Sequence, residues 1–378
     1  MATSHADIQP KFFPLELIIQ TMSALFLRLA HLRDVCIGML NLFTGRMQGS
    51  LVHRIPRKDL TGKTCLITGG NSGIGLSIAK SMAERGCNVI LTSRSKEKGE
   101  EAVDHVCEHV VACSQKAGER DVKPNIEMEQ LDNASFASVR SLVDGLEKKS
   151  KIDFLFFNAG FPGTAGDIFT EDDHELTYQS NFLSSFLMTH LLLERDLLTP
   201  DARIIFTAST GQYGGRFSDD FQASSTKGMV EPGFHGPPYT KSRYVNVNPS
   251  SRYANTKLMQ VVFTKLLQHH FDSLSPTPST EKQTPLGHQQ MSAHVFTPSY
   301  CATPIFGKTD IPSPFNDLLF WFLVVATRIA VPVEEGAATG VWLALKEGIE
   351  MGGYWDRCCR RSSNVIFTFP SIVAVQSC

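Results

Sequence analysis

Residues 63–75 read KTCLITGGNSGIG, and this stretch decides the fold. A short run rich in apolar and β-branched residues, typical of a strand, reaches Thr68 and is followed by glycines. Residues 73–86 then show helical periodicity and end at Gly86, and CNVILTSR at 87–94 is a second apolar run. Two strands joined through a helix predict a parallel βαβ unit.

The glycines between the first strand and the helix are typical of a phosphate-binding turn. Glycine lets the backbone turn tightly and approach a pyrophosphate, whose charge is stabilised by the N-terminus of the following helix. The motif lies between a strand and a helix, as this mechanism requires. The alternative is a turn with a structural role only.

The pattern of strands and helices continues along the chain. Further strand-like runs lie at 152–157, 203–207 and 293–297, and helical stretches lie near 76–85, 95–112, 135–149, 174–197 and 251–270. Such alternation predicts an α/β fold, with one doubly wound parallel sheet and helices on both faces. Two segments rich in turn-forming residues, 211–250 and 273–291, are predicted to be surface insertions.

The composition is that of a globular protein. The 378 residues are 42% hydrophobic and 20% charged, and 36 Lys and Arg against 38 Asp and Glu give a formal net charge of -2. The sequence has no long basic stripe of the kind that binds a phosphate backbone, which argues against nucleic acid as a partner. Nine cysteines without a CxxC pair indicate reduced thiols inside a cell.

An apolar block at residues 12–43 precedes the βαβ unit. Its apolar residues recur at intervals of three and four, which predicts an amphipathic helix. Charged residues interrupt the run too often for a membrane-spanning helix. The block also lacks the cleavage site of a secretory signal. Residues 1–60 hold seven Lys and Arg against four Asp and Glu, which favours attraction to an anionic membrane surface. The alternative is an extra helix packed on the body of the protein.

The end of the second strand indicates which dinucleotide is bound. A carboxylate at this position usually binds the ribose 2′-hydroxyl of NAD, whereas this chain has Ser93 and Arg94. A guanidinium and a hydroxyl can hold a 2′-phosphate through charge-assisted hydrogen bonds. We therefore predict NADP(H) rather than NAD(H), although an exposed arginine can also serve solubility alone.

Residues 253–257 read YANTK and place a tyrosine and a lysine one helical turn apart. An unperturbed tyrosine has a pKa of about 10, and a neighbouring cation favours its phenolate, which eases proton exchange near neutral pH. Tyr253 and Lys257 are therefore candidates for acid–base chemistry. Such a pair also arises by chance in many helices, so the spacing alone does not decide.

Four motifs occur together in a characteristic order. They are Thr68-Gly69-x-x-x-Gly73-x-Gly75, then Asn158-Ala159-Gly160 after a strand, Ser209 after a strand, and Tyr253-x-x-x-Lys257. Over residues 60–356 the chain resembles the short-chain dehydrogenase/reductase family. The segments GKTCLITGGNSGIG and VEEGAATGVWLAL look most like its retinol dehydrogenase and ketosteroid reductase members. The resemblance implies a single Rossmann-type catalytic domain.

The resemblance also implies four catalytic residues. Tyr253 would donate a proton to a carbonyl oxygen in reduction, or accept one from an alcohol in oxidation, and Ser209 would hydrogen-bond the same oxygen. Lys257 would bind the nicotinamide ribose and lower the pKa of Tyr253. Asn181 would maintain a water-mediated proton relay to the lysine. No metal is needed, because hydride passes between the nicotinamide and the substrate carbon.

The cofactor-binding residues follow from the same resemblance. Asp132 would lie at the adenine, Asn158 beside the adenosine ribose, and Thr303 at the nicotinamide carboxamide. The family's usual Pro-Gly after the sixth strand is Pro298-Ser299 here, so we expect a local difference near the nicotinamide. The other predicted positions line the pyrophosphate turn or carry the preference for NADP(H), in addition to Tyr253 and Lys257: Gly69, Ser72, Gly73, Ile74, Gly75, Ser93 and Arg94.

Residues 304–332 are expected to form the substrate wall. Their aromatic and aliphatic side chains suit a large lipophilic ketone or alcohol, such as a steroid, retinoid, terpenoid or polyketide. We therefore predict an NADP(H)-dependent oxidoreductase that interconverts a carbonyl and an alcohol on such a molecule. The alternatives are NAD-dependent alcohol oxidation by the same site, and a catalytically silent nucleotide-binding scaffold.

The predicted organisation has three parts. An N-terminal helical extension at 1–59 precedes a catalytic domain at 60–356, and a divergent tail follows at 357–378. A homodimer is left open. So is a peripheral contact with an intracellular membrane that faces the cytosol, such as the endoplasmic reticulum.

Overall fold

The computed structural model describes most of the catalytic domain and parts of its flanks. The described residues are 29, 32–34, 36–37, 40–41, 45–118, 123–163, 168–215, 249–274, 290–299, 301 and 330–363. Most of the two predicted insertions, Thr303 and nearly all of the predicted substrate wall lie outside them.

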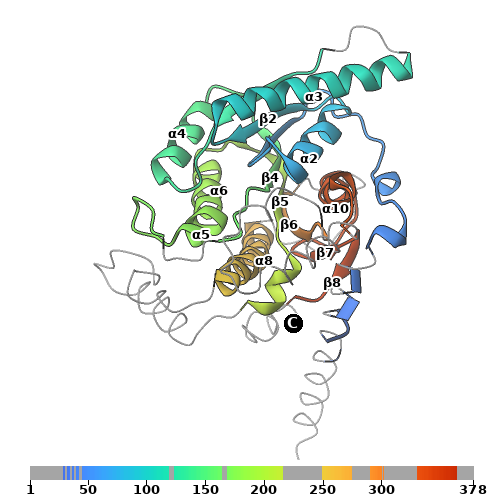
Figure 1. Ribbon diagram of the computed structural model, residues 1–378. Helices are drawn as coiled ribbons and strands as arrows, with labels where there is room; N and C mark the ends of the chain where they lie inside the picture. Colours follow the sequence, from blue (N-terminus) through green and yellow to red (C-terminus); the bar gives the residue numbers. More distant parts are fainter. Residues whose placement is uncertain are drawn as a thin grey trace, which may run out of the picture.

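A single sheet forms the centre of the molecule (Figure 1). Its strand order is β3-β2-β1-β4-β5-β6-β7-β8, and every neighbouring pair is parallel except the last. The strands β1, β4 and β6 are buried along their whole length, as expected for a sheet covered on both faces. The strand bounds are β1 Thr64–Ile67, β2 Asn88–Ser93, β3 Ile126–Gln130, β4 Ile152–Phe157, β5 Leu198–Thr207, β6 Ser292–Thr297, β7 Tyr354–Asp356 and β8 Cys359–Arg361.

Helices cover both faces of this sheet, which confirms the predicted doubly wound α/β fold. On one face α4 (Phe136–Leu146), α6 (Ser184–Glu194) and α8 (Pro249–Leu274) bury Leu142, Met188 and Leu258 in one apolar core. On the other, α2 (Gly73–Ala83), α3 (Lys96–Ala117) and α10 (Val333–Leu345) bury a second core. Short helical turns complete the set: η1 Gly45–Gln48, η2 Val52–Arg54, α5 Leu176–Tyr178, the π-turn η3 Gln179–Leu183 and η4 Thr210–Gly214.

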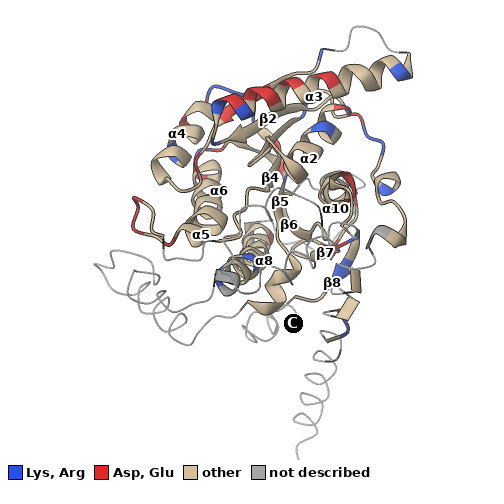
Figure 2. Ribbon diagram, viewed as in Figure 1, with Lys and Arg blue, Asp and Glu red and all other residues tan. Residues whose placement is uncertain are grey.

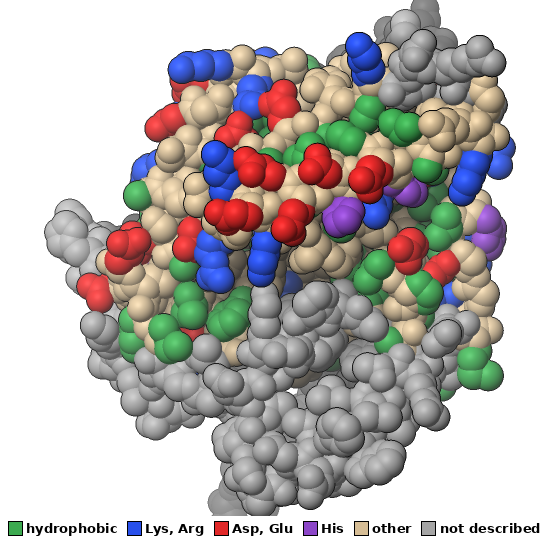
Figure 3. All heavy atoms as spheres, turned by 45° about the horizontal axis from the view of Figure 1, so that its top comes forward, with side chains coloured by type: hydrophobic (Ala, Val, Ile, Leu, Met, Phe, Trp, Pro, Cys, Tyr) green, Lys and Arg blue, Asp and Glu red, His purple; other side chains and the backbone are tan. Residues whose placement is uncertain are grey.

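The described surface carries mixed charge. Acidic residues follow the outer side of α3 (Figure 2), and the turned view shows them gathered over this helix (Figure 3). Glu97, Glu101 and Glu108 belong to this exposed group. Ala102 and Val106 of the same helix are buried. The helix therefore presents one apolar face to the sheet and one charged face to solvent.

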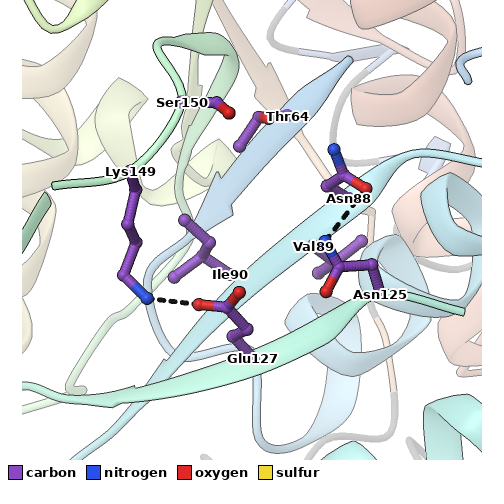
Figure 4. A pocket seen from close by; sticks show the side chains of 8 residues that line it. All are labelled: Thr64, Asn88, Val89, Ile90, Asn125, Glu127, Lys149 and Ser150. Carbon is purple, nitrogen blue, oxygen red and sulfur yellow. Dashed lines mark hydrogen bonds and ion pairs between the residues drawn. The ribbon is translucent and has the colours of Figure 1, made fainter. Parts of the chain in front are cut away.

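The parallel sheet brings the predicted motifs to one edge. The glycine turn follows β1, Asn158 follows β4, Ser209 follows β5 and Ser299 comes after β6. Because all of these strands run in the same direction, their carboxyl ends form the crevice in which ligands of doubly wound folds bind. A hollow of about 50 Å³ lies at the opposite, amino edge, where Lys149 pairs with Glu127 (Figure 4). It is too small to hold a dinucleotide.

The sheet extends beyond the boundary placed at residue 356. β7 and β8 form a hairpin whose two loop residues, Arg357 and Cys358, have φ of 51° and 57°. A two-residue hairpin loop with positive φ at both positions matches the right-handed twist of its strands. Glycine or asparagine usually occupies such positions. The first residues of the segment separated as a tail therefore belong to the edge of the sheet.

The described residues before the domain pack against this same edge. The buried Asp34 accepts a hydrogen bond from the backbone nitrogen of Ser362 at 2.7 Å, and the Asn41 amide donates to Asp356. Arg357 donates to the Gly49 carbonyl oxygen at 2.9 Å. Thus polar side chains join this segment to the hairpin. Among the described residues, no helix has both the length and the apolar character needed to cross a bilayer.

Candidate active site

The glycine turn has a conformation that other residues rarely adopt. Gly69 and Gly73 have φ of 64° and 54°, in the left-handed region that favours glycine. A Cβ placed on Gly75 would lie 2.3 Å from the Gly69 carbonyl oxygen and 2.5 Å from Nδ2 of Asn158. Helix α2 begins at Gly73, after Ser72, whose side chain makes no capping bond. The turn therefore fits a pyrophosphate, because it brings bare backbone to a helix N-terminus.

Asn158 connects this turn to the middle of the sheet. Its Nδ2 donates to the carbonyl oxygens of Thr68 and Gly69, both at 3.3 Å. In return, Oγ1 of Thr68 accepts from the backbone nitrogens of Asn158 at 3.0 Å and Ala159 at 3.1 Å. Asn158 thus holds the glycine turn to the end of β4.

The two residues predicted to select NADP(H) lie in different environments. Arg94 is exposed, and its guanidinium makes no ion pair within the described part of the chain. Ser93 is the last residue of β2 and is only 3% exposed. A phosphate bound at the end of β2 would therefore contact the exposed Arg94, whereas the Ser93 side chain is buried.

Asp132 forms part of a local turn after β3. Its Oδ1 accepts from the backbone nitrogen of Ala134 at 2.9 Å, and its own nitrogen donates to Oγ of Ser138 at 2.9 Å. This arrangement is an Asx-turn leading into α4, whose N-cap is Ser135. The carboxylate of Asp132 thus has a structural partner in addition to the role predicted for it at the adenine.

Ser209, Tyr253 and Lys257 come together at the carboxyl edge of β5. Oγ of Ser209 and Cε1 of Tyr253 would each lie 3.4 Å from a Cβ placed on Gly211, and Nζ of Lys257 lies 5.5 Å from the centre of the Tyr253 ring. Oγ of Ser209 also accepts from the Gly211 nitrogen at 3.0 Å, so it caps η4. Residues from two elements, separated by 44 positions between Ser209 and Tyr253, thereby form one cluster.

The lysine is held by neutral groups. Its Nζ donates to the Thr207 carbonyl oxygen at 2.8 Å and to Oε1 of Gln260 at 3.2 Å. The side chain is 2% exposed, and burial lowers the pKa of Lys257 to about 7. Burial disfavours the charged ammonium because, within the described part of the chain, no carboxylate compensates for the lost hydration.

The pKa of Tyr253 differs in direction from the prediction. Burial raises it above the usual tyrosine value, and the Ser209 side chain lowers it only in part. Tyr253 is therefore a phenol at neutral pH, the form that can donate a proton.

Asn181 lies in the π-turn η3 and is fully enclosed. Its side chain bonds both backbone groups of Phe161, accepting from the nitrogen at 2.7 Å and donating to the oxygen at 2.8 Å. Its Nδ2 also donates to Oγ1 of Thr256 at 3.1 Å, and its backbone carbonyl oxygen accepts from Nε2 of Gln260 at 2.8 Å. π-turns are frequent at functional sites, because they redirect helical backbone groups.

Gln260 is the site residue that the motifs missed. It connects Lys257 to Asn181 and lies three residues after the lysine, seven after Tyr253. Spacings of three and seven place residues on one face of a helix, so this position could have been found from the sequence. Nothing in the sequence indicates what that face contacts.

Ser299 has the backbone conformation of the glycine that it replaces. Its φ is 60°, so the turn after β6 keeps a left-handed residue despite the change. Its Oγ donates to Oδ1 of Asp356 at 3.4 Å, and burial raises the pKa of that carboxyl. The Asp356 carboxyl also accepts from Asn41, so the segment before the domain reaches the turn beside the predicted nicotinamide site.

Comparisons with known proteins agree with the doubly wound α/β fold. The sequence model described as short chain dehydrogenase matches residues 63–229. Human dehydrogenase/reductase SDR family member 13 is 30% identical over 304 residues, covering 79% of this chain and 67% of that protein. Human retinol dehydrogenase 14 is 28% identical over 335 residues, covering 85% and 87%. A crystal structure of an uncharacterized protein from Mycobacterium paratuberculosis has a TM-score of 0.52 at 22% identity, covering 79% and 81%, a likeness of fold alone.

Proposed function

The chain belongs to the short-chain dehydrogenase/reductase family of NAD(P)-dependent oxidoreductases, and we propose that it interconverts a carbonyl and an alcohol on a lipophilic molecule using NADP(H). The observation that carries this proposal is the cluster of Ser209, Tyr253 and Lys257 at the same edge of the sheet as the glycine turn. A silent scaffold would have no need for a buried lysine whose partners among the described residues are all neutral.

The chain's residues divide the chemistry between them. When bound at the glycine turn, the nicotinamide cofactor supplies or accepts the hydride. Tyr253 donates its phenolic proton to the carbonyl oxygen during reduction and accepts one from the alcohol during oxidation. Ser209 donates a hydrogen bond to the same oxygen, which stabilises the charge that develops there. Lys257 would hold the nicotinamide ribose of the cofactor. When protonated, it stabilises the phenolate that Tyr253 forms on proton transfer.

The lipophilic substrate class is supported by the names of several relatives. Retinol dehydrogenase 14 of human and retinol dehydrogenase 13 of mouse are each about equally similar to this chain, at 28% and 29% identity. Retinol is a long apolar alcohol with a single hydroxyl. The aromatic residues predicted to contact such a molecule lie in 304–332, and all of them are outside the described residues.

The preference for NADP(H) rests on Arg94. We expect the full-length protein to consume NADPH with a panel of steroid, retinoid and polyketide ketones, and to use NADH less well. Arg94→Ala should weaken NADPH binding about 10- to 100-fold and leave NADH binding nearly unchanged, because only NADPH carries the 2′-phosphate. Fluorescence titration with each cofactor measures both affinities.

Lys96→Ala is the matched control for this substitution, because Lys96 is exposed two residues away and already faces Glu100 at 3.8 Å. It should leave both affinities unchanged. Equal loss in the two variants would mean that only general positive charge matters. No turnover of any ketone or alcohol by the wild type would instead favour the scaffold.

We also propose that the segment before the domain attaches the protein to an intracellular membrane surface. Leu29, Leu32 and Leu40 are each more than half exposed, whereas the polar Asp34 and Asn41 face the body of the protein. This is the reverse of an ordinary packed surface helix. Exposed basic residues follow in the same segment, including Arg54 and Arg57.

A combined Leu29→Ser, Leu32→Ser and Leu40→Ser variant should lose most of its flotation with vesicles that contain an anionic phospholipid, since the apolar contact is removed. Val111→Ser changes a similarly exposed apolar residue on α3 and should float like the wild type. If the triple variant also floats like the wild type, this segment does not make the contact.

A further inference from the structure

Gln260 joins two residues of the proposed catalytic group. It is 1% exposed, and its Oε1 accepts a hydrogen bond from Nζ of Lys257 at 3.2 Å. Its Nε2 donates to the backbone carbonyl oxygen of Asn181 at 2.8 Å. One side chain therefore spans the path from the lysine to Asn181, where the family resemblance implies a water-mediated relay.

The contacts on both sides keep this bridge in place. Thr264 lies one turn further along α8, and its Oγ1 donates to the backbone carbonyl oxygen of Gln260 at 2.7 Å. Lys257 is also held by Thr207, and Asn181 by both backbone groups of Phe161. A buried polar network in which each member is paired holds its side chains in one geometry.

An amide side chain donates and accepts hydrogen bonds but does not titrate near neutral pH. We propose that Gln260 is a positioning residue, an inference that rests on the proposed function. It fixes the Lys257 amine beside Tyr253 and takes the place of water between the lysine and Asn181.

The surroundings of Lys257 make its protonation sensitive to this one contact. Within the described residues, Tyr253 is the titratable side chain placed against Lys257, and burial is the cause of its lowered pKa. The other ionisable groups on elements packed around α8 face elsewhere: Glu175 faces Arg252, His174 packs on Tyr178, His294 contacts Ser292, Tyr213 donates to Ser362, and Arg203 donates to Leu343 and Lys346.

Two nearly isosteric substitutions should move the pH profile in opposite directions. Gln260→Glu places a carboxylate beside Lys257 and raises its pKa, whereas Gln260→Leu removes an acceptor and lowers it. Carbonyl reduction should fall as pH rises through the pKa of Lys257, because the charged amine stabilises the phenolate. We expect that fall in kcat/KM to shift up by about one pH unit in Gln260→Glu and down by about one in Gln260→Leu.

Thermal unfolding of the cofactor-free protein gives a second readout that needs no turnover. The pKa of Lys257 is about 7 when folded and about 10.4 when unfolded, so the unfolded chain binds the extra proton between these values. Stability therefore rises with pH across this window. The rise in Tm between pH 7 and about 9 should flatten in Gln260→Glu and begin at lower pH in Gln260→Leu.

Gln268→Leu is the matched control. Gln268 is also buried on α8, where it donates to Asp272 and accepts from the Ala293 nitrogen, away from the site. This variant should lower the Tm equally at every pH. If both Gln260 variants behave like Gln268→Leu, Gln260 is only structural and the inference is wrong. If the wild type shows no turnover, the proposed function fails, but the Tm profiles still decide the role of Gln260. If Gln260→Leu does not fold, Gln260→Glu decides alone.

Discussion

Replacing Tyr253 with Phe is expected to lower kcat/KM by about 10²- to 10⁴-fold, the usual contribution of a positioned general acid or base. The phenylalanine ring keeps the packing beneath Lys257, whose Nζ lies 5.5 Å from the ring centre. Only the hydroxyl is lost, and the Ser209 side chain beside it is unchanged. Affinity for the cofactor should change little, because the glycine turn and Arg94 are untouched. Steady-state kinetics and NADPH titration of the same samples separate the two effects.

Tyr213→Phe provides the control for removing a tyrosine hydroxyl close to the site. Tyr213 lies in η4, a few residues from Ser209, and its hydroxyl donates to the Ser362 carbonyl oxygen at 3.0 Å. Its loss should cost about 1 kcal/mol of stability and leave turnover intact. Equal turnover by Tyr253→Phe and the wild type would remove Tyr253 from the mechanism.

The sequence predicts those parts of the site that depend on local rules and on the direction of the strands. A strand, a glycine turn and a helix at 63–86 define a parallel unit, and parallel strands place every following turn at one edge. Gly69, Asn158 and Ser209 therefore converge without any knowledge of side-chain contacts. The spacing of Tyr253 and Lys257 similarly follows from the helical repeat.

Several elements of the sheet were not apparent in the sequence because their residues are not typical of strands. β3 alternates Glu127 and Glu129 with partly buried apolar residues at the edge of the sheet, so it lacks the apolar run of a central strand. The hairpin of β7 and β8 turns on Arg357 and Cys358, neither of which signals positive φ. The predicted helix at 174–197 is divided by the π-turn that contains Asn181.

The electrostatics of the site depend on tertiary burial. Sequence spacing places a cation near Tyr253, but only the structure shows that Lys257 is enclosed and bonded to neutral groups. Desolvation then outweighs the expected effect, so the pKa of Tyr253 rises while that of Lys257 falls. The same reason hides Gln260, whose importance comes from what it touches rather than from its type.

Gly75→Ala is expected to abolish most cofactor binding and to destabilise the protein by about 1–3 kcal/mol, the typical cost of forcing an extra methyl group into packed structure. The added Cβ would lie 2.3 Å from the Gly69 carbonyl oxygen, and 2.5 Å from Nδ2 of Asn158. Backbone atoms of the turn must move to relieve this contact. The Asn158 bonds that hold Thr68 and Gly69 would be disturbed at the same time. NADPH and NADH should therefore lose affinity together, by at least about tenfold, in contrast to Arg94→Ala.

Gly145→Ala tests whether this effect comes from the contact or from the substitution itself. Gly145 lies within α4, and a Cβ there would meet nothing within 4 Å. In a helix, alanine is favoured over glycine by about 1 kcal/mol, so this variant should be more stable and should bind the cofactors normally. Cofactor titration and thermal unfolding of both variants give the comparison. If Gly75→Ala binds NADPH as well as Gly145→Ala does, the glycine turn does not hold the pyrophosphate, and the placement of the cofactor at α2 is wrong.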